Sequence, residues 1–181
     1  MCGIAGYAGT GTAQARERVE RAVAALRHRG PDDAGAWTGE GACLGFARLS
    51  IIDLSPAGHQ PMLSGDGAGG ADGRYVIVFN GEIYNFPELR RELEAQGVAL
   101  RGHSDTEVLL EIFARVGLEA CLAKLRGMFA FAVWDRREQT LSLARDLHAR
   151  ILLIVFDGNQ RATHADTCHR LLTEFKPTRS S

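Results

Sequence analysis

Apolar and polar positions follow one another along the chain in patterns that predict both strands and helices. Residues 1–9 are small and apolar and contain too many glycines for a helix, so they predict a buried strand. Apolar residues recur at helical spacing over residues 13–29, which predicts a helix that ends at Gly30. Residues 43–54 favour one or two strands, and residues 64–73, mostly Gly, Asp, Ala and Ser, predict a mobile surface loop.

The second half of the chain carries clearer signals. Residues 75–79 are β-branched and apolar, which predicts a strand, and residues 87–96 predict a helix closed by glycine. Ser104 and Glu107 stand three positions apart before an apolar run. This is the pattern of a helix N-cap with a capping box, in which the two side chains bond each other's backbone N–H groups.

The helix that Ser104 begins is expected to run to about Val116, with a second short helix over residues 118–125. Residues 128–134 and 140–144 predict the strands of a hairpin with a polar turn between them. Strands dominate the predicted core and helices are grouped between them. This order favours a layered α+β fold over a parallel doubly wound sheet.

Length and composition narrow the class of protein. With 181 residues, 45% apolar and 24% charged, the chain fits one soluble domain with its own core. The net charge of -1 predicts neither nucleic acid nor an anionic membrane as a partner, and the longest apolar run, residues 151–156, is too short to span a bilayer. The N-terminus lacks the pattern of a secretory signal, so we expect a cytoplasmic protein. Four scattered cysteines without a CxxC pair predict neither disulfides nor a metal site.

Cys2 is the first candidate for chemistry. The initiator Met is usually removed before a small residue, which would leave this cysteine with a free α-amine of ordinary pKa about 7.7 to 8. One residue then carries both a nucleophilic thiol and its general base. Taken alone the position is a weak signal, because buried structural cysteines are commoner than reactive ones.

Further motifs strengthen this signal. They are MCGIAG at 1–6, RHRGPDD at 27–33, RLSIIDL at 48–54, FNGEIYN at 79–85, HSDTEVLL at 103–110, GMFAFAVWD at 127–135 and ARD at 144–146. Their order and spacing resemble the class II glutamine amidotransferases, and their combination resembles the asparagine synthetases most. For residues 1–146 the resemblance implies an N-terminal-nucleophile hydrolase fold, a four-layer α/β/β/α sandwich of antiparallel sheets.

The resemblance also implies roles for single residues. Cys2 is the implied nucleophile, with the Asn80 side chain and the Gly81 N–H as donors to the oxyanion; a plain Asn-Gly turn is the alternative for that pair. Arg48 is implied to bind the α-carboxylate of L-glutamine and Asp105 its α-ammonium. The alternatives are a surface arginine and a carboxylate that merely favours a helix start. Further substrate contacts are implied for Leu49, Ile51, Ile52 and Glu82.

These roles imply a short mechanism. The Cys2 sulfur attacks the glutamine carboxamide, the α-amine takes the proton, ammonia leaves, and water hydrolyses the γ-glutamyl thioester to glutamate. The 27–33 segment is expected to build the site rather than to react. Structural or surface roles are expected for His28, His59 and His103.

The resemblance stops after Asp146. Residues 147–181 lack the segments that the family has next, which we interpret as a frameshift, a truncation or a fused tail. Residues 151–156 are expected to form a substitute strand or to leave a sheet edge open, and the last ten or so residues to be poorly ordered. An unrelated polar tail, rather than a metal site, is expected around His164, Cys168 and His169.

No cofactor is expected in this chain. ATP and Mg are implied only for a synthetase domain, missing or separately encoded, that would use the ammonia to amidate aspartate. The family is often homodimeric. The sequence leaves several hypotheses open: an active glutaminase, the glutaminase subunit of a separate synthetase, the same domain of an asparagine-synthetase-like enzyme with another acceptor, and a silent fragment or binding module.

Overall fold

The computed structural model describes residues 2–9, 12–65, 73–146, 154–156, 162–164 and 173–175. Its helices are α1 (Thr12–Ala25), α2 (Phe86–Ala95) and α3 (Asp105–Lys124), with a short 3-10 helix η1 (Pro56–Gly58). Its strands are β1 (Gly3–Ala8), β2 (Asp33–Gly39), β3 (Ala42–Arg48), β4 (Met62–Leu63), β5 (Tyr75–Ile83), β6 (Gly127–Asp135), β7 (Thr140–Arg145), β8 (Ile154–Phe156), β9 (Ala162–His164) and β10 (Thr173–Phe175).

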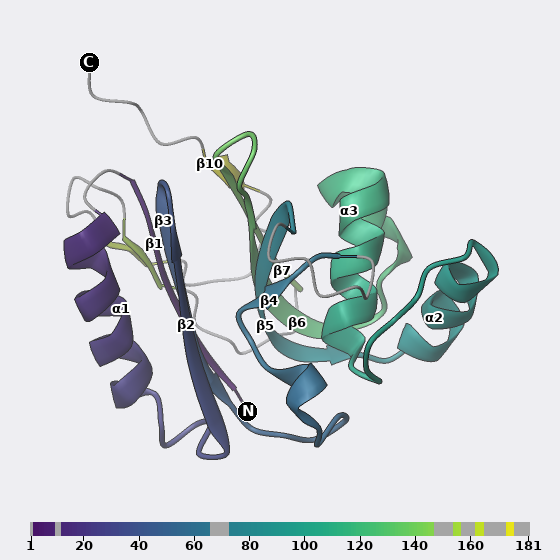
Figure 1. Cartoon of the computed structure of the whole chain (residues 1–181), viewed down its shortest axis with the longest axis horizontal. Coiled ribbons are helices and arrows are strands. Elements are labelled where there is room, and N and C mark those ends of the chain that lie inside the picture. The colour runs from purple at the N-terminus through teal and green to yellow at the C-terminus, as the bar shows by residue number, and fades with distance from the viewer. Residues whose placement is uncertain are drawn as a thin grey trace.

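The strands within these ranges form two five-stranded sheets that face each other (Figure 1). One sheet has the order β2-β3-β1-β8-β9 and the other β10-β7-β6-β5-β4. Helix α1 covers the outer face of the first sheet, and α3 covers the outer face of the second (Figure 1). The predicted α/β/β/α sandwich is therefore confirmed. Neighbouring strands are antiparallel except β1 and β8, which run parallel with Tyr7 opposite Phe156.

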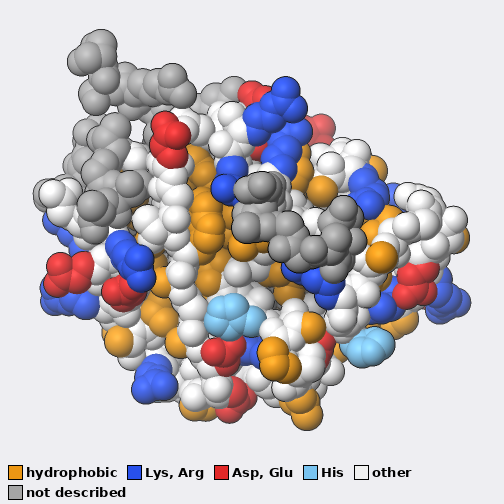
Figure 2. Space-filling view, in the orientation of Figure 1, with side chains coloured by type: hydrophobic (Ala, Val, Ile, Leu, Met, Phe, Trp, Pro, Cys, Tyr) orange, Lys and Arg blue, Asp and Glu red, His pale blue; other side chains and the backbone are white. Residues whose placement is uncertain are grey.

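Three apolar clusters hold the layers together. Val19 and Val23 of α1 pack on Cys43 and Ala47 of β3. Between the sheets, side chains of β1 and β3 meet those of β5, β6 and β7, including the fully buried Trp134. Figure 2 shows apolar side chains in the gap between the two sheets. The third cluster joins α2 and α3 to the outer face of the second sheet. Strands covered on both faces are apolar almost throughout, which explains the runs in β3 and β6.

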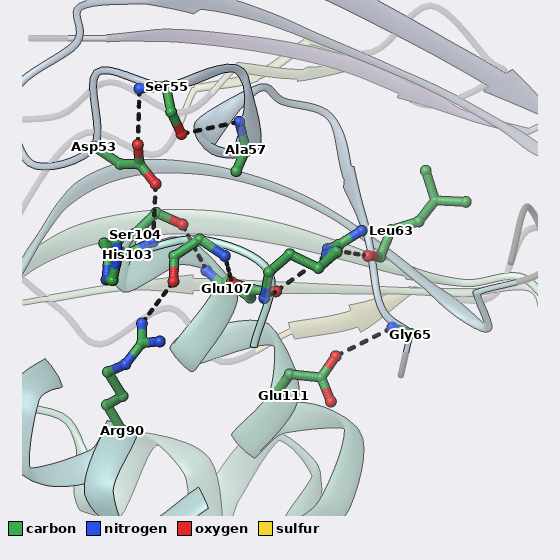
Figure 3. A network of polar contacts seen from close by, with 12 residues as sticks. Asp53, Ser55, Ala57, Leu63, Gly65, Arg90, His103, Ser104, Glu107 and Glu111 are labelled. Atoms are coloured by element: carbon green, nitrogen blue, oxygen red, sulfur yellow. Dashed lines mark hydrogen bonds and ion pairs between the residues drawn. The ribbon is translucent and has the colours of Figure 1, made fainter. Parts of the chain in front are cut away.

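Helix α3 begins and breaks where the sequence predicts. The Ser104 hydroxyl accepts a 3.2 Å hydrogen bond from the Glu107 N–H and so caps the helix. Gly117 has φ 77° and ψ 179°, a conformation that favours glycine, and it divides α3 into two helical pieces. The other half of the predicted capping box is wrong. The loop before the helix turns back on it, so the Glu107 carboxylate accepts from the N–H groups of Arg101 and Gly102 instead (Figure 3).

Four of the described strands are not predicted by the sequence, namely β2, β4, β9 and β10. In β2 half-buried and exposed residues alternate, but they are mostly small and form no apolar run. Strand β4 is only two residues long. Conversely, the strand signal of residues 43–54 ends at Arg48, and residues 49–54 are irregular. This irregular segment passes beside the N-terminal end of β1, where Leu49 contacts Cys2.

Several expectations for the loop and the tail fall on undescribed residues. Strand β8 covers part of the predicted substitute strand, and residues 151–153 lie outside the described residues. The expectations for residues 66–72, for Cys168 and His169, and for residues 176–181 lie outside them as well. The expected poor order of the last ten or so residues is wrong for residues 173–175, which form β10 and pair with β7. His164 is described only as part of the backbone of β9.

Candidate active site

A pocket lies where the start of β1, the loop after β3, the end of β5 and the first turn of α3 meet. Its volume is about 190 Å³. Every residue for which the sequence analysis expects a direct role lines it: Cys2, Arg48, Leu49, Ile51, Ile52, Asn80, Gly81, Glu82 and Asp105. The fold thus brings together residues that are far apart in the sequence.

Cys2 reaches this pocket with its side chain half-buried. The Leu49 N–H donates to the sulfur at 3.3 Å, and the thiol lies 3.5 Å from the Leu49 carbonyl, to which it donates. Burial raises the pKa of the Cys2 thiol, while the hydrogen bond from Leu49 and the charge of Arg48 act in the opposite direction. The resting thiol is therefore protonated at neutral pH and needs a base before it can attack.

The 27–33 segment supports the nucleophile, in agreement with its expected structural role. Arg29 Nε donates to the Cys2 carbonyl at 3.2 Å. The Asp32 carboxylate accepts a 2.8 Å hydrogen bond from the Ser50 N–H, on the loop after β3. These two contacts hold the start of β1 and the pocket loop in a fixed relation.

Arg48 supplies positive charge at one end of the pocket, although it is only 7% exposed. Its guanidinium donates to the Ser55 carbonyl at 3.1 Å and to the Asp53 carbonyl. Gly58 lies directly against it, since a Cβ on this glycine would stand 2.2 Å from Arg48 Nη2. Both hydrogen-bond acceptors are neutral carbonyls, so the charge of Arg48 stays available to an anion.

Asn80 and Gly81 lie near the end of β5. Asn80 is 3% exposed, and no described residue bonds its carboxamide. The N–H groups of Phe79 and Ile83 leave the strand for the side chains of Gln60 and Asp105, at 2.7 and 3.1 Å. Since strand N–H groups alternate in direction, the Gly81 N–H between them points to the same side. Asn80 and Gly81, each with an N–H donor, therefore both line the pocket.

Only glycine fits at position 81. Gly81 has φ 155°, and a Cβ there would stand 2.2 Å from the Met128 carbonyl oxygen of β6. The absence of a side chain lets β6 approach the strand closely and leaves the Gly81 N–H uncovered on the pocket side.

Asp105 supplies negative charge at the other end of the pocket and is 5% exposed. Burial raises the pKa of its carboxyl to about 6; hydrogen bonds from the N–H groups of Ile83 and Thr106 oppose the rise, and the charge of Glu82 adds to it. An incoming ammonium group would offset the cost of keeping this carboxylate ionised.

Asp53 is a pocket residue for which the sequence analysis assigned no role. Its carboxylate accepts from the N–H of Ser55 at 2.8 Å and from the N–H of His103 at 2.9 Å (Figure 3). Burial works against ionisation here, but these hydrogen bonds and the charge of Arg48 hold the pKa of Asp53 below its ordinary value. Asp53 therefore connects two segments: the loop that contains the hydrogen-bond partners of Arg48, and the start of α3. An acidic residue two positions before Ser55 is typical of such a turn, and this signal could have found it.

The pocket lining contains none of the three histidines for which structural or surface roles are expected, His28, His59 and His103. His28 Nδ1 lies 2.9 Å from the Ala25 carbonyl, and His59 Nδ1 lies 2.6 Å from the Asp33 carboxylate. His103 contributes its backbone N–H to Asp53.

Within the described ranges, no three His, Cys, Asp or Glu side chains group so as to hold a metal ion. In the same ranges, every helix is too short or too polar to cross a membrane.

Comparison with known proteins decides the family. The model of the glutamine amidotransferase domain matches residues 1–175. This chain belongs to the glutamine amidotransferase family. Membership agrees with the pocket, whose lining includes Cys2 together with Asn80 and Gly81. The predicted enzyme class is confirmed by the family.

Two relatives and one solved structure refine the comparison. Asparagine synthetase [glutamine-hydrolyzing] 1 of Bacillus subtilis is 43% identical over 150 residues, which cover 81% of this chain and 22% of the relative. Asparagine synthetase [glutamine-hydrolyzing] 3 of the same organism is 39% identical over 151 residues, 81% of this chain and 23% of the relative. The glutamine phosphoribosylpyrophosphate amidotransferase of B. subtilis, solved with ADP and GMP, superposes with a TM-score of 0.67 at 21% identity, over 97% of this chain and 45% of that one.

These comparisons confirm the predicted resemblance and fold. The amidotransferase likeness shows the same fold in a solved structure. The relatives named asparagine synthetase share over a third of their aligned residues with this chain, which spans less than a quarter of their length.

Proposed function

We propose that this chain hydrolyses L-glutamine to glutamate and ammonia, with Cys2 as the nucleophile. The observation that carries the proposal is that one pocket holds the thiol, two hydrogen-bond donors, a buried cation and a buried carboxylate. The cation, Arg48, and the carboxylate, Asp105, suit the two charged ends of a free amino acid. The donors, Asn80 and Gly81, suit the oxyanion that forms when an amide is attacked.

The chemistry needs a base, because burial keeps the thiol protonated. Once Met1 is removed, the α-amine belongs to Cys2 itself and can take the thiol proton. The sulfur then forms a bond to the carboxamide carbon, and the carbonyl electron pair moves onto the oxygen. When that pair returns, the C–N bond breaks and nitrogen leaves as ammonia with the transferred proton. Water finally hydrolyses the thioester, which releases glutamate and restores the thiol.

The use of the ammonia is a separate part of the proposal. We infer that it passes to an ATP- and Mg-dependent synthetase domain that amidates aspartate, because the relatives named asparagine synthetase are several times longer than this chain. The amidotransferase pocket gives no information about the acceptor, so another carboxylate acceptor remains the alternative. The family model matches as far as residue 175, whereas the recognisable motifs end at Asp146. We therefore also propose residues 1–146 as the amidotransferase unit that carries the reacting residues and 147–181 as a divergent tail.

Glutamate release from glutamine by the purified chain tests the proposal. Removal of Met1 is first checked by intact mass. We expect turnover that disappears in Cys2→Ala and persists in Cys121→Ala, a matched control because that cysteine is buried in the helix-side core. A folded chain without Met1 that releases no glutamate would contradict the proposal and leave a silent fragment or a binding module.

A further inference from the structure

Gln60 is a buried residue that the proposed chemistry does not use. It lies in the segment between η1 and β4, is 4% exposed and lines the pocket. Its Oε1 accepts a 2.7 Å hydrogen bond from the Phe79 N–H, and its Nε2 donates to the Thr106 hydroxyl at 3.2 Å. One carboxamide therefore connects β5 with the first turn of α3.

Both partners stand next to residues with proposed roles. Phe79 directly precedes Asn80 and Gly81, and Thr106 directly follows Asp105. The link thus joins the strand that presents the oxyanion donors to the helix turn that presents the carboxylate for the ammonium group.

The edge of β5 explains why a side chain is needed here. Strand β4 pairs with β5 only at Val76 and Ile77. Beyond that point Phe79 N–H has no partner strand on this side, and the Gln60 oxygen takes the place of a backbone carbonyl. The Ile83 N–H is bonded to the Asp105 side chain. Gly81 therefore lies between two residues whose N–H groups already have side-chain acceptors, and its own N–H is left open to the pocket.

We propose, on the basis of the proposed function, that Gln60 is a positioning residue for glutamine hydrolysis. Its carboxamide fixes the pocket edge of β5 so that Asn80 and Gly81 face the reacting carbonyl, and it sets the distance from this edge to Asp105. Gln60 acts through these residues and contacts neither the thiol nor the reacting atoms.

The substitution Gln60→Leu tests this role, because leucine has a similar length and makes neither hydrogen bond. It leaves the Phe79 N–H buried without an acceptor, so the strand edge relaxes. We expect kcat to fall by about tenfold or more, since small displacements at a reacting centre cost rate steeply. Thr106→Val removes only the bond to α3 and should raise KM more than it lowers kcat, because Asp105 is displaced while β5 stays fixed.

Gln96→Leu is the matched control, since Gln96 is an exposed residue at the end of α2. Circular dichroism and thermal melting establish that each variant is folded. Backbone amide exchange of Phe79, Asn80 and Gly81, followed by NMR, measures the strand edge without reference to activity. Faster exchange at these amides in Gln60→Leu, with the control unchanged, is the expected result.

The outcomes separate the two proposals. If the wild-type chain releases no glutamate, the proposed function fails, and amide exchange still decides whether Gln60 fixes the strand edge. If the wild type is active but folded Gln60→Leu keeps kcat and KM within about twofold, the positioning role is overturned. Unchanged exchange at Phe79 in that variant overturns it as well.

Discussion

The Asp105 carboxylate accepts a 3.1 Å hydrogen bond from the Ile83 N–H, two positions after Gly81 on β5. The group proposed to hold the ammonium end of glutamine is therefore tied to the strand proposed to stabilise the oxyanion. This hydrogen bond ties Asp105 to the Ile83 end of β5, whereas the Phe79 end of the strand is held separately by Gln60.

The raised pKa of Asp105 predicts a pH-dependent affinity for glutamine. Its carboxyl has a pKa of about 6 in the empty pocket, and an ammonium group binds only the ionised form. We expect KM for glutamine to rise as the pH falls through about 6, and Asp105→Asn to raise KM at neutral pH and remove this dependence. Steady-state kinetics between pH 5 and pH 8 measure it. A KM that does not change with pH in the wild type would contradict the assignment.

The Asp105 carboxyl also predicts an effect on stability: replacing it by Asn weakens glutamine binding but should stabilise the fold. Because the pKa of Asp105 is raised on folding, ionisation is costly in the folded state above about pH 6 and costs nothing below about pH 4. Asp105→Asn should therefore stabilise the unliganded fold by about 1–3 kcal/mol at pH 7.5 and by less at pH 5. Denaturant unfolding at the two pH values checks this, and an equal effect at both would show that ionisation is not its cause.

Asn80 predicts a loss of rate without a loss of fold. No described residue bonds its carboxamide, so truncation leaves no buried partner unsatisfied. Asn80→Ala should lower kcat by about 100- to 1,000-fold, the usual cost of removing one oxyanion donor, while KM changes little. The kinetic constants and the melting temperature are measured together. A large rise in KM at unchanged kcat would instead place Asn80 in ground-state binding.

Adding a single methyl group at Gly58 is predicted to weaken the binding of glutamine. A Cβ there would stand 2.2 Å from Arg48 Nη2, the mobile end of a long side chain, so the guanidinium has to move. Gly58→Ala should raise KM for glutamine several-fold and leave the protein folded. Gly65→Ala is the control, because its Cβ would meet nothing within 4 Å. An unchanged KM in Gly58→Ala would show that the position of Arg48 does not limit binding.

Two substitutions of Trp134, in the core between the sheets, are predicted to lower the free energy of unfolding by different amounts. Trp134 is fully buried, and its Nε1–H has no hydrogen-bond partner among the described residues. Trp134→Ala should cost about 3–5 kcal/mol through the cavity that it leaves. Trp134→Phe should cost much less, because it keeps an aromatic ring and removes the unpaired donor. Denaturant unfolding of both variants gives the comparison; a loss in Trp134→Phe as large as that in Trp134→Ala would contradict this prediction.

Local signals in the sequence predict much of the fold. The N-cap at Ser104 and the break at Gly117 both depend on backbone conformations that few residues favour, and both are confirmed. The hairpin of β6 and β7 has two long apolar strands and a polar turn, and it too is confirmed. Strand β2 escapes prediction because its small, partly exposed residues carry little hydrophobic signal.

The parts of the site that the sequence does not predict depend on distant partners. Nothing near Gln60 in the chain indicates that its carboxamide meets β5 and α3, since these contacts span 19 and 46 positions. Glu107 is predicted to bond its own helix start and instead bonds the loop before it. Resemblance to a family places the reacting residues in one pocket, but it assigns no role to the side chains that hold them there.

Strand β1 lies inside its sheet, between β3 and β8. Tyr7 of β1 pairs with Cys43 of β3 on one side and with Phe156 of β8, about 150 positions further along the chain, on the other. Pairing over so long a separation is slow to form. Removal of Met1, which the proposed chemistry requires, is easier before β1 has both partners, because the finished fold half-buries Cys2. We therefore expect maturation of the nucleophile to precede closure of the sheet around it.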